Sequence, residues 1–190
     1  MNFMIKNGKR GAGQVNKFWV TADWHLNHYN ILRYSSRPFS TIQDMNETII
    51  NNFNSVVGKN DIIVHAGDFT LIKNRERVYK EYVKRLKGNN IFLRGSHDYW
   101  LPKSAPTIFE KEIEGYYVVV CHYAMRVWAR SHFNSFMLYG HSHGRLEPIG
   151  KQWDIGVDNN NFYPVSFEQI LEIMKTRPDN LNLVGGRNEL

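Results

Sequence analysis

The feature that most constrains the fold of this chain is how its apolar segments end. Five short segments have the composition of buried strands, and each runs directly into residues that can bind a metal ion. In α/β folds, sites are assembled at the carboxyl ends of strands. Five such endings therefore predict one shared site rather than five separate loops. The pairs of segment and ending are 17–22 with Asp23-Trp24-His25, 61–66 with Gly67-Asp68, 90–94 with Gly95-Ser96-His97-Asp98, 116–121 with His122, and 136–139 with Gly140-His141-Ser142-His143.

Helical patterns alternate with these strands. Residues 41–57 carry apolar side chains at helical spacing, and Thr41 with Asp44 resembles a helix-start signature. Residues 74–86 form a charged amphipathic pattern closed by Gly88. A last strand is predicted over 153–157, and a last helix over 166–175 with Ser166 as its cap. The alternation predicts an α/β fold.

The chemistry of the endings favours a divalent metal. Carboxylates and neutral imidazoles are the expected ligands of borderline ions such as manganese, iron, nickel or zinc. In His-x-His, residues two apart on an extended strand share one face. The carboxylate of Asp68 has two oxygens and can bridge two ions. Glycines before the ligands are expected to let the backbone bend and to leave room for substrate.

The order of these motifs resembles the calcineurin-like metallophosphoesterases. Their pattern is Asp-x-His, Gly-Asp, Gly-Asn-His-Asp/Glu, a lone His and Gly-His-x-His, and the resemblance runs from about residue 17 to residue 157. It is closest to the small members without a cap domain found in bacteria and phages. The resemblance implies an αββα two-sheet sandwich and hydrolysis of phosphoesters by two divalent ions that bridge and activate a water.

The resemblance also implies roles for single residues. His97 matches the catalytic histidine of the family, which contacts the leaving group or a phosphate oxygen. Two metal ions, expected to be Mn, Fe, Ni or Zn, would share Asp68. The first would be held by Asp23, His25, Asp68 and His143, and the second by Asp68, Ser96, His122 and His141.

Two positions depart from the family pattern. Ser96 stands where the family has a metal-binding Asn, and a hydroxyl is a poorer and shorter ligand than an amide oxygen. We therefore expect the second metal to bind more weakly. Leu71 stands where many relatives have a His or Asp that orients the catalytic histidine, so the partner of His97 is left open.

Other residues have both a functional and a structural interpretation. Arg126, four residues after His122, is expected to bind phosphate during catalysis, and Arg33 and His28 are expected to bind substrate. Each could equally be a surface charge or a loop residue. Arg94 and Arg130 are further candidate cations, whereas Arg37 is expected to brace a loop. Asp98 is expected to hold the loop around His97. We expect His65 and Cys121 to lie in the core and His132 to be exposed.

Five aromatic residues adjoin the motifs. Flat rings beside a phosphate site can stack on a nucleic-acid base, whereas core packing is the more common role of such rings. They weigh modestly in favour of a nucleotide or nucleic-acid substrate. The five residues are Trp24, Tyr99, Trp100, Tyr123 and Trp128.

Charge and composition narrow the setting. The net charge is +6, but four of the 24 basic residues lie in the first 17 positions, which hold no acid. The rest of the chain has 20 basic residues against 18 acidic ones, so bulk charge argues weakly for nucleic-acid binding. We expect a flexible basic tail over 1–16, a metallophosphoesterase domain over 17–176 and a tail over 177–190. The single cysteine, and the lack of a membrane-spanning run or signal peptide, predict a cytoplasmic protein without a membrane partner.

The function predicted from the sequence is a metal-dependent phosphohydrolase. The absence of a cap insertion favours an open site and therefore a phosphodiesterase over a monoesterase. One alternative is a non-catalytic scaffold on the same fold, for which Ser96 is the only argument. Another is a nucleic-acid-binding nuclease subunit, which salt-sensitive DNA or RNA binding would distinguish.

Overall fold

A computed structural model describes residues 16–180 of the chain. The first of two sheets has the strand order β3-β2-β1-β8. Strand β1 (Phe18–Thr21) pairs in parallel with β2 (Ile62–His65), which pairs in parallel with β3 (Asn89–Phe92). The short β8 (Val165–Ser166) is antiparallel to β1. The carboxyl ends of β1, β2 and β3 therefore point to the same edge of this sheet.

The second sheet has the order β4-β5-β6-β7. Strands β4 (Ile108–Ile113) and β5 (Tyr116–Cys121) form an antiparallel hairpin. The connecting Glu114 and Gly115 both have positive φ, as a tight two-residue hairpin turn requires. Strands β5, β6 (Ser135–Tyr139) and β7 (Gln152–Asp154) run in parallel.

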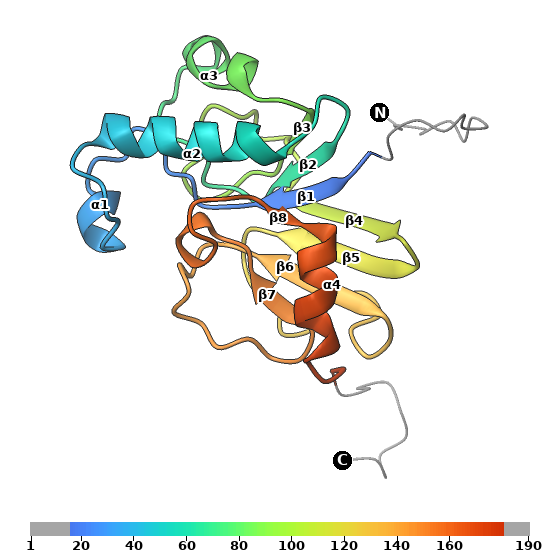
Figure 1. Cartoon of the computed structure of the whole chain (residues 1–190). Coiled ribbons are helices and arrows are strands. Elements are labelled where there is room, and N and C mark those ends of the chain that lie inside the picture. Colours follow the sequence, from blue (N-terminus) through green and yellow to red (C-terminus); the bar gives the residue numbers. More distant parts are fainter. Residues whose placement is uncertain (1–15, 181–190) are drawn as a thin grey trace.

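Helices cover the outer face of the first sheet (Figure 1). Helix α2 (Ile42–Val56) packs Met45, Ile49 and Phe53 against that sheet, and α3 (Arg75–Glu81) adds Val78 to the same cluster. The side chain of Thr41 accepts a hydrogen bond from the Asp44 amide at the start of α2. A single turn, α1 (Ile31–Tyr34), and two 3₁₀ turns, η1 (Val83–Arg85) and η2 (Val157–Asn159), complete the helical part before α4.

The main core lies between the sheets. Val20 and Val64 from the first sheet face Val118 and Leu138 from the second. Helix α4 (Phe167–Lys175) follows β8 directly and contributes Phe167, Ile170 and Met174 to the same core. The outer face of the second sheet carries a smaller cluster, in which Met137 and Tyr139 are covered by Trp128 from a loop.

The α/β two-sheet sandwich predicted from the sequence is confirmed. All six strands expected from the sequence are present within a few residues of their expected ends, and Ser166 caps α4. The single helix expected over 74–86 is wrong. Helix α3 ends at Glu81, and the chain then turns so that the hydroxyl of the buried Tyr82 meets Asn27 and Asn46. The sequence did not predict β4, β8 or α1.

The expected tails fall largely outside the described residues. Residues 1–15 of the basic tail and 181–190 of the C-terminal tail are not described, so both tails remain expectations. Within residues 16–180, no helix combines the length and the apolar character needed to cross a membrane.

Candidate metal centre

The strand ends from both sheets meet in one place. The loop after β1 carries Asp23 and His25, and the loop after β2 carries Asp68. The second sheet supplies His122 directly after β5 and the His141–His143 turn after β6. Hydrogen bonds from backbone amides join these loops, because the His25 amide donates to the Asp68 carbonyl and the His141 amide donates to the side-chain Oδ2 of Asp23.

The backbone of the predicted ligands is unusual. Asp23, His25, Asp68, His141 and His143 all have φ between 47° and 69°, in the left-handed region that residues other than glycine rarely adopt. Such conformations cost on the order of 1–3 kcal/mol each and cluster at functional sites. Five at one edge of a sandwich indicate that the fold holds these side chains in place at the expense of local backbone stability.

The glycines before the ligands allow close approach of neighbouring loops. A Cβ atom on Gly67, whose φ is 93°, would lie 2.7 Å from the Cα of Gly95 and 2.8 Å from Nδ1 of His122. A Cβ atom on Gly140 would lie 2.7 Å from Oδ2 of Asp23. The space that these glycines leave is filled by protein atoms, not kept for substrate as expected from the sequence.

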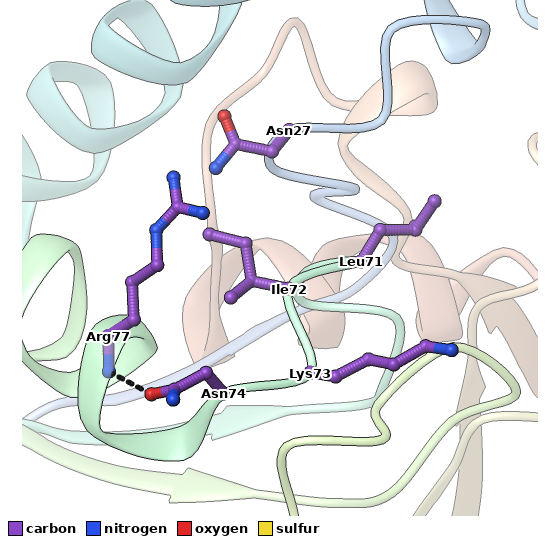
Figure 2. A pocket seen from close by; sticks show the side chains of 6 residues that line it. All are labelled: Asn27, Leu71, Ile72, Lys73, Asn74 and Arg77. Carbon is purple, nitrogen blue, oxygen red and sulfur yellow. Dashed lines mark hydrogen bonds between the residues drawn. The ribbon is translucent and has the colours of Figure 1, made fainter.

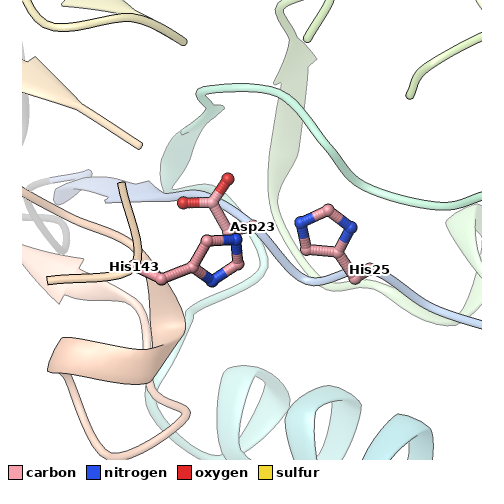
Figure 3. Close-up of side chains that lie close together, drawn as sticks. All are labelled: Asp23, His25 and His143. Carbon is pink, nitrogen blue, oxygen red and sulfur yellow. The ribbon is translucent and has the colours of Figure 1, made fainter. Parts of the chain in front are cut away.

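One group of potential ligands consists of Asp23, His25 and His143. Figure 3 shows the Asp23 carboxylate next to the His143 ring, with the His25 ring beside them. One ligand atom from each residue lies within 4.8 Å of the others, and the two rings stack with centroids 5.2 Å apart. Asp23 and His25 are buried and His143 is half-buried, so a cation placed among them would be largely shielded from water.

Asp68 lies between two further groups. Its carboxylate forms one with His122 and His141, and another with His25 and His97, each again within 4.8 Å. Oδ2 of Asp68 is 3.3 Å from Nε2 of His122 and 3.7 Å from Nε2 of His25. The geometry therefore brings together every histidine and aspartate predicted to bind metal, with Asp68 at the centre.

Three buried atoms of these groups lack a hydrogen-bond partner: Asp23 Oδ1, His25 Nε2 and His122 Nε2. Leaving a buried polar atom unpaired is costly, so native structures do it rarely. Each of these atoms is a lone-pair donor of the kind that divalent transition metals bind. The donor set thus fits divalent metal ions.

Charge within the site is set by burial and by neighbouring residues. Burial raises the pKa of Asp23 to about 7, against the opposing charges of His122 and His143. Burial also lowers the pKa of His25 far below its usual range, so this imidazole is neutral and able to bind a metal. Burial acts to raise the pKa of Asp68, but the close approach and charge of His122 outweigh it, so the pKa is depressed and the carboxylate stays ionised.

The Asp68 carboxylate is further held by the loop after β3. Ser96 Oγ donates to Asp68, with distances of 2.9 and 3.2 Å to the two oxygens, and the His97 amide donates to Oδ1 at 2.8 Å. As predicted, Asp98 fixes this loop. Its buried carboxylate accepts hydrogen bonds from the amides of Asp68 and Gly95 and thereby ties the loops after β2 and β3 together.

Two carboxylates, one at the end of β7 and one just after it, also belong to the site, and the sequence prediction missed both. Asp158 accepts a hydrogen bond from Nδ1 of His143, while Asp154 accepts from the Ser142 hydroxyl and the Gly144 amide. Both follow the same rule as the ligands, since they lie at or just after the end of a strand. Applied to the last predicted strand, 153–157, this rule would have drawn attention to Asp158.

The residues predicted to assist catalysis lie at different depths. His97 is half-exposed, with Nε2 3.9 Å from Asp68 Oδ2 and its ring centroid 5.4 Å from that of His25. His28 is half-buried beside it, and the two ring centroids are 5.8 Å apart. No side chain of the described residues hydrogen-bonds to the His97 ring, so the partner that Leu71 fails to provide is not replaced within them.

The predicted cations are less closely tied to the site. The exposed Arg33 lies over the Tyr34 ring, and the exposed Arg126 makes no ion pair or hydrogen bond within residues 16–180. Arg130 pairs instead with Glu112 on β4. Arg37 braces a loop as predicted, because its buried guanidinium donates to the carbonyls of Asp23 and Trp24.

Most of the other structural interpretations are also confirmed. Trp24, Trp100, Trp128, His65 and Cys121 are buried, whereas His132 is exposed. His65 is bonded to Asn90 and stacks on Phe92, and burial lowers its pKa to about 4. Of the five aromatic residues next to the motifs, only Tyr99 and Tyr123 are exposed. Tyr123 packs edge-on against His141, with ring centroids 4.8 Å apart.

A hollow of about 390 Å³ adjoins the loops that carry the ligands. Asn27 lies two residues after His25, and Leu71 lies three after Asp68. Figure 2 shows the long side chains of Lys73 and Arg77 at the hollow, and the Lys73 ammonium lies 5.4 Å from the Tyr99 ring centroid. No acidic residue of the described chain lines it; the lining residues are Asn27, Leu71, Ile72, Lys73, Asn74 and Arg77.

A two-sheet sandwich with Asp and His residues at its strand ends defines a class of metal-binding phosphoesterases, and comparisons with known proteins agree. Residues 16–184 match the family described as calcineurin-like phosphoesterase. The chain belongs to that family. It is 31% identical over 168 residues to an uncharacterized protein of Methanocaldococcus jannaschii, an alignment that covers 85% of this chain and 93% of the relative.

The fold is also found in a solved structure. A protein of unknown function from Aquifex aeolicus superposes with a TM-score of 0.63 at 20% identity, over 84% of this chain and all of that one. A predicted phosphoesterase from Streptococcus pneumoniae superposes with a TM-score of 0.42 at 16% identity, over 74% of this chain and 71% of that one.

Proposed function

We propose that this protein is a phosphodiesterase that uses two divalent metal ions, with Asp68 shared between them. The observation that carries the proposal is the set of three buried ligand atoms without a hydrogen-bond partner, on Asp23, His25 and His122. In the first position we place Asp23, His25, Asp68 and His143, and in the second Asp68, His122, His141 and the hydroxyl of Ser96. When bound, such ions lower the pKa of a water and offset charge on a phosphoryl group.

The protein's own groups would prepare the site for this chemistry. Asp68 stays ionised at neutral pH because its pKa is depressed, and His25 stays neutral because its pKa is lowered by burial. The Nδ1 of His122 is paired with the Ala66 carbonyl at 2.9 Å, which leaves Nε2 facing Asp68. Since the loops are locked by Asp98, little reorganisation is needed when a cation binds.

We assign the acid–base role to His97. Its ring lies beside Asp68 yet is half-exposed, so it can reach a substrate from the solvent side. A histidine in that position can donate a hydrogen bond or a proton to the departing oxygen. His28, Arg33 and Arg126 are assigned to substrate binding, with Arg126 also contacting phosphate during the reaction. Their exposed or half-exposed positions allow this without any rearrangement of the core.

The preference for diesters is supported by the hollow beside the ligand loops. Lys73 at its rim would favour a second anionic group on the substrate, whereas the Arg77 guanidinium already pairs with Glu81 at 2.7 Å. The exposed rings of Tyr99 and Tyr123 offer faces on which a base could stack. We therefore favour nucleotide-type or nucleic-acid-type diesters, hydrolysed in the cytoplasm.

The test is a hydrolysis assay of metal-free protein to which manganese, nickel, magnesium or zinc is returned singly. We expect bis-p-nitrophenyl phosphate to be hydrolysed faster than p-nitrophenyl phosphate with at least one metal. No turnover should occur in the presence of a chelator. Faster hydrolysis of the monoester would contradict the diester preference, and absence of turnover with every metal would favour a non-catalytic scaffold.

A substitution of His97 distinguishes a role in catalysis from a role in metal binding. Replacing it with alanine should lower the rate by about 10²-fold or more, the scale of general acid–base assistance, and leave the bound metal unchanged. The exposed His132 provides a matched control, since its replacement by alanine should alter neither quantity. If metal were lost in proportion to the rate, His97 would be a ligand, as its group with His25 and Asp68 also permits.

A further inference from the structure

A buried ion pair between Arg37 and Asp158 contacts the ligand group formed by Asp23, His25 and His143. The guanidinium of Arg37 donates two hydrogen bonds to Asp158, from Nε to Oδ1 at 2.8 Å and from Nη2 to Oδ2 at 2.7 Å. The Arg37 side chain is completely buried, and that of Asp158 is 11% exposed. Ion pairs of this kind are weak sources of stability because both charges lose their hydration. Stability alone therefore does not explain why this pair is present.

The pair is connected to two of the predicted ligands. Oδ2 of Asp158 accepts a hydrogen bond from Nδ1 of His143 at 2.7 Å. Nη2 of Arg37 donates to the backbone carbonyl of Asp23 at 2.6 Å. Arg37 and Asp158 thus form one continuous chain of hydrogen bonds from the backbone of Asp23 to the ring of His143.

This arrangement fixes which nitrogen of His143 is free. A carboxylate that accepts from Nδ1 holds the proton on that atom and leaves the lone pair on Nε2. Since Nδ1 is occupied, Nε2 is the atom available to a metal held with Asp23 and His25. Carboxylates in this position orient metal-bound histidines and increase the basicity of the ring.

We propose that Asp158 is a positioning residue for the first metal, and that Arg37 holds the Asp158 carboxylate in place and aligns it with Asp23. The inference rests on the proposed two-metal function. It concerns one of the two positions, because Asp158 bonds to His143, whereas His122 in the second position is oriented by the Ala66 carbonyl. Loss of Asp158 should therefore weaken one metal site and spare the other.

The experiment compares Asp158→Asn with Asp61→Asn. Asp61 is a matched control, since it is also a buried carboxylate and accepts hydrogen bonds from Trp19 Nε1 and the Gly58 amide, but it contacts none of the predicted ligands. Metal-free full-length protein is titrated with Mn²⁺ by calorimetry. We expect Asp158→Asn to weaken one class of binding by about 10–100-fold, the usual effect of losing such a partner. The affinity of the other class of sites in Asp158→Asn should equal that of the wild type. In Asp61→Asn, both classes should bind Mn²⁺ as in the wild type.

A second measurement keeps the proposal testable if Asp158→Asn does not fold. ¹⁵N NMR of the histidine rings in the metal-free wild-type protein should show His143 protonated at Nδ1. After addition of Zn²⁺, which is diamagnetic and so takes the place of Mn²⁺ in this measurement, His143 should be coordinated through Nε2. Coordination through Nδ1, or equal weakening of both Mn²⁺ classes in Asp158→Asn, would overturn the proposal. Unchanged Mn²⁺ binding in Asp158→Asn would overturn the role of Asp158 and leave the proposed function standing. Absence of Mn²⁺ binding in the wild type would overturn the proposed function as well.

Discussion

Asp23 shows at the residue scale how the site and the stability of the protein oppose each other. Its carboxylate is completely buried, and burial raises its pKa from 3.8 to about 7. A raised pKa means that the folded protein holds this proton more tightly than the unfolded chain does. The contribution of Asp23 to the free energy of unfolding is therefore fully present below about pH 4 and is lost as the pH rises through 7.

This leads to a pH-dependent prediction for metal-free protein. Asp23→Asn stays neutral at every pH, so its stability relative to the wild type should increase as the pH rises from 4 to 7. The gap should grow by about 1.4 kcal/mol for each pH unit within that window at most. Urea unfolding in the presence of a chelator measures it, with the exposed Asp44→Asn as a control. A gap that does not vary with pH would show that Asp23 is already ionised without metal.

The residues of the site differ in how well they could be predicted from sequence. Asp23, His25, Asp68, His122, His141 and His143 were found because strand ends point to one edge, and the structure does bring them together. Asp158 and Arg37 were not connected in advance, since they are 121 positions apart and only the fold makes them neighbours. The hydrogen bond from the Ser96 hydroxyl to Asp68 could not be predicted from sequence either, because it depends on the path of the loop after β3.

Among the helices and strands, those predicted correctly from sequence are the ones that are buried on one face or on all sides. Strands β1, β2, β5 and β6 are nearly continuous apolar runs, and α2 has one apolar stripe. Strand β4 was missed because its sequence, Ile-Phe-Glu-Lys-Glu-Ile, is mostly exposed at a sheet edge and carries charges. The end of α3 was misplaced because the Asn27–Asn46–Tyr82 contacts that turn the chain lie far apart in sequence.

Helix α4 offers a test of an element that supports the core without contacting the ligands. Ser166 Oγ accepts a hydrogen bond from the Gln169 amide, and the Gln169 side chain accepts one from the Ser166 amide. Ser166→Ala should therefore lower the free energy of unfolding by about 1 kcal/mol, the usual cost of losing an N-cap. Thermal or urea unfolding measures the change.

Ser55→Ala is the matched control, because that exposed hydroxyl bonds to a carbonyl within α2 and caps no helix start. It should cost less than Ser166→Ala. Metal affinity should be the same in both variants, since α4 packs into the core between the sheets. A large loss of metal binding in Ser166→Ala would mean that α4 does position the ligands.

For the whole molecule, the site exists only because two sheets are packed together. The first sheet supplies Asp23, His25 and Asp68, and the second supplies His122 and the His141–His143 turn. The parallel bridge between Ala22 and Gly156 links the extension of β1 to the segment after β7. The sandwich could be predicted only through the family resemblance that the motifs carry, whereas the irregular cover of the second sheet around Trp128 left no periodic signal in the sequence.

If Asp68 joins two metal positions, the number of metal ions bound to each chain depends on its carboxylate. Wild-type protein and Asp68→Asn are stripped of metal, titrated with Mn²⁺, and analysed for bound metal by elemental analysis. We expect two ions for each wild-type chain, the second bound more weakly because Ser96 stands in place of an amide ligand, and loss of both classes of binding in Asp68→Asn. Unchanged stoichiometry in Asp68→Asn would show that Asp68 does not join the two positions.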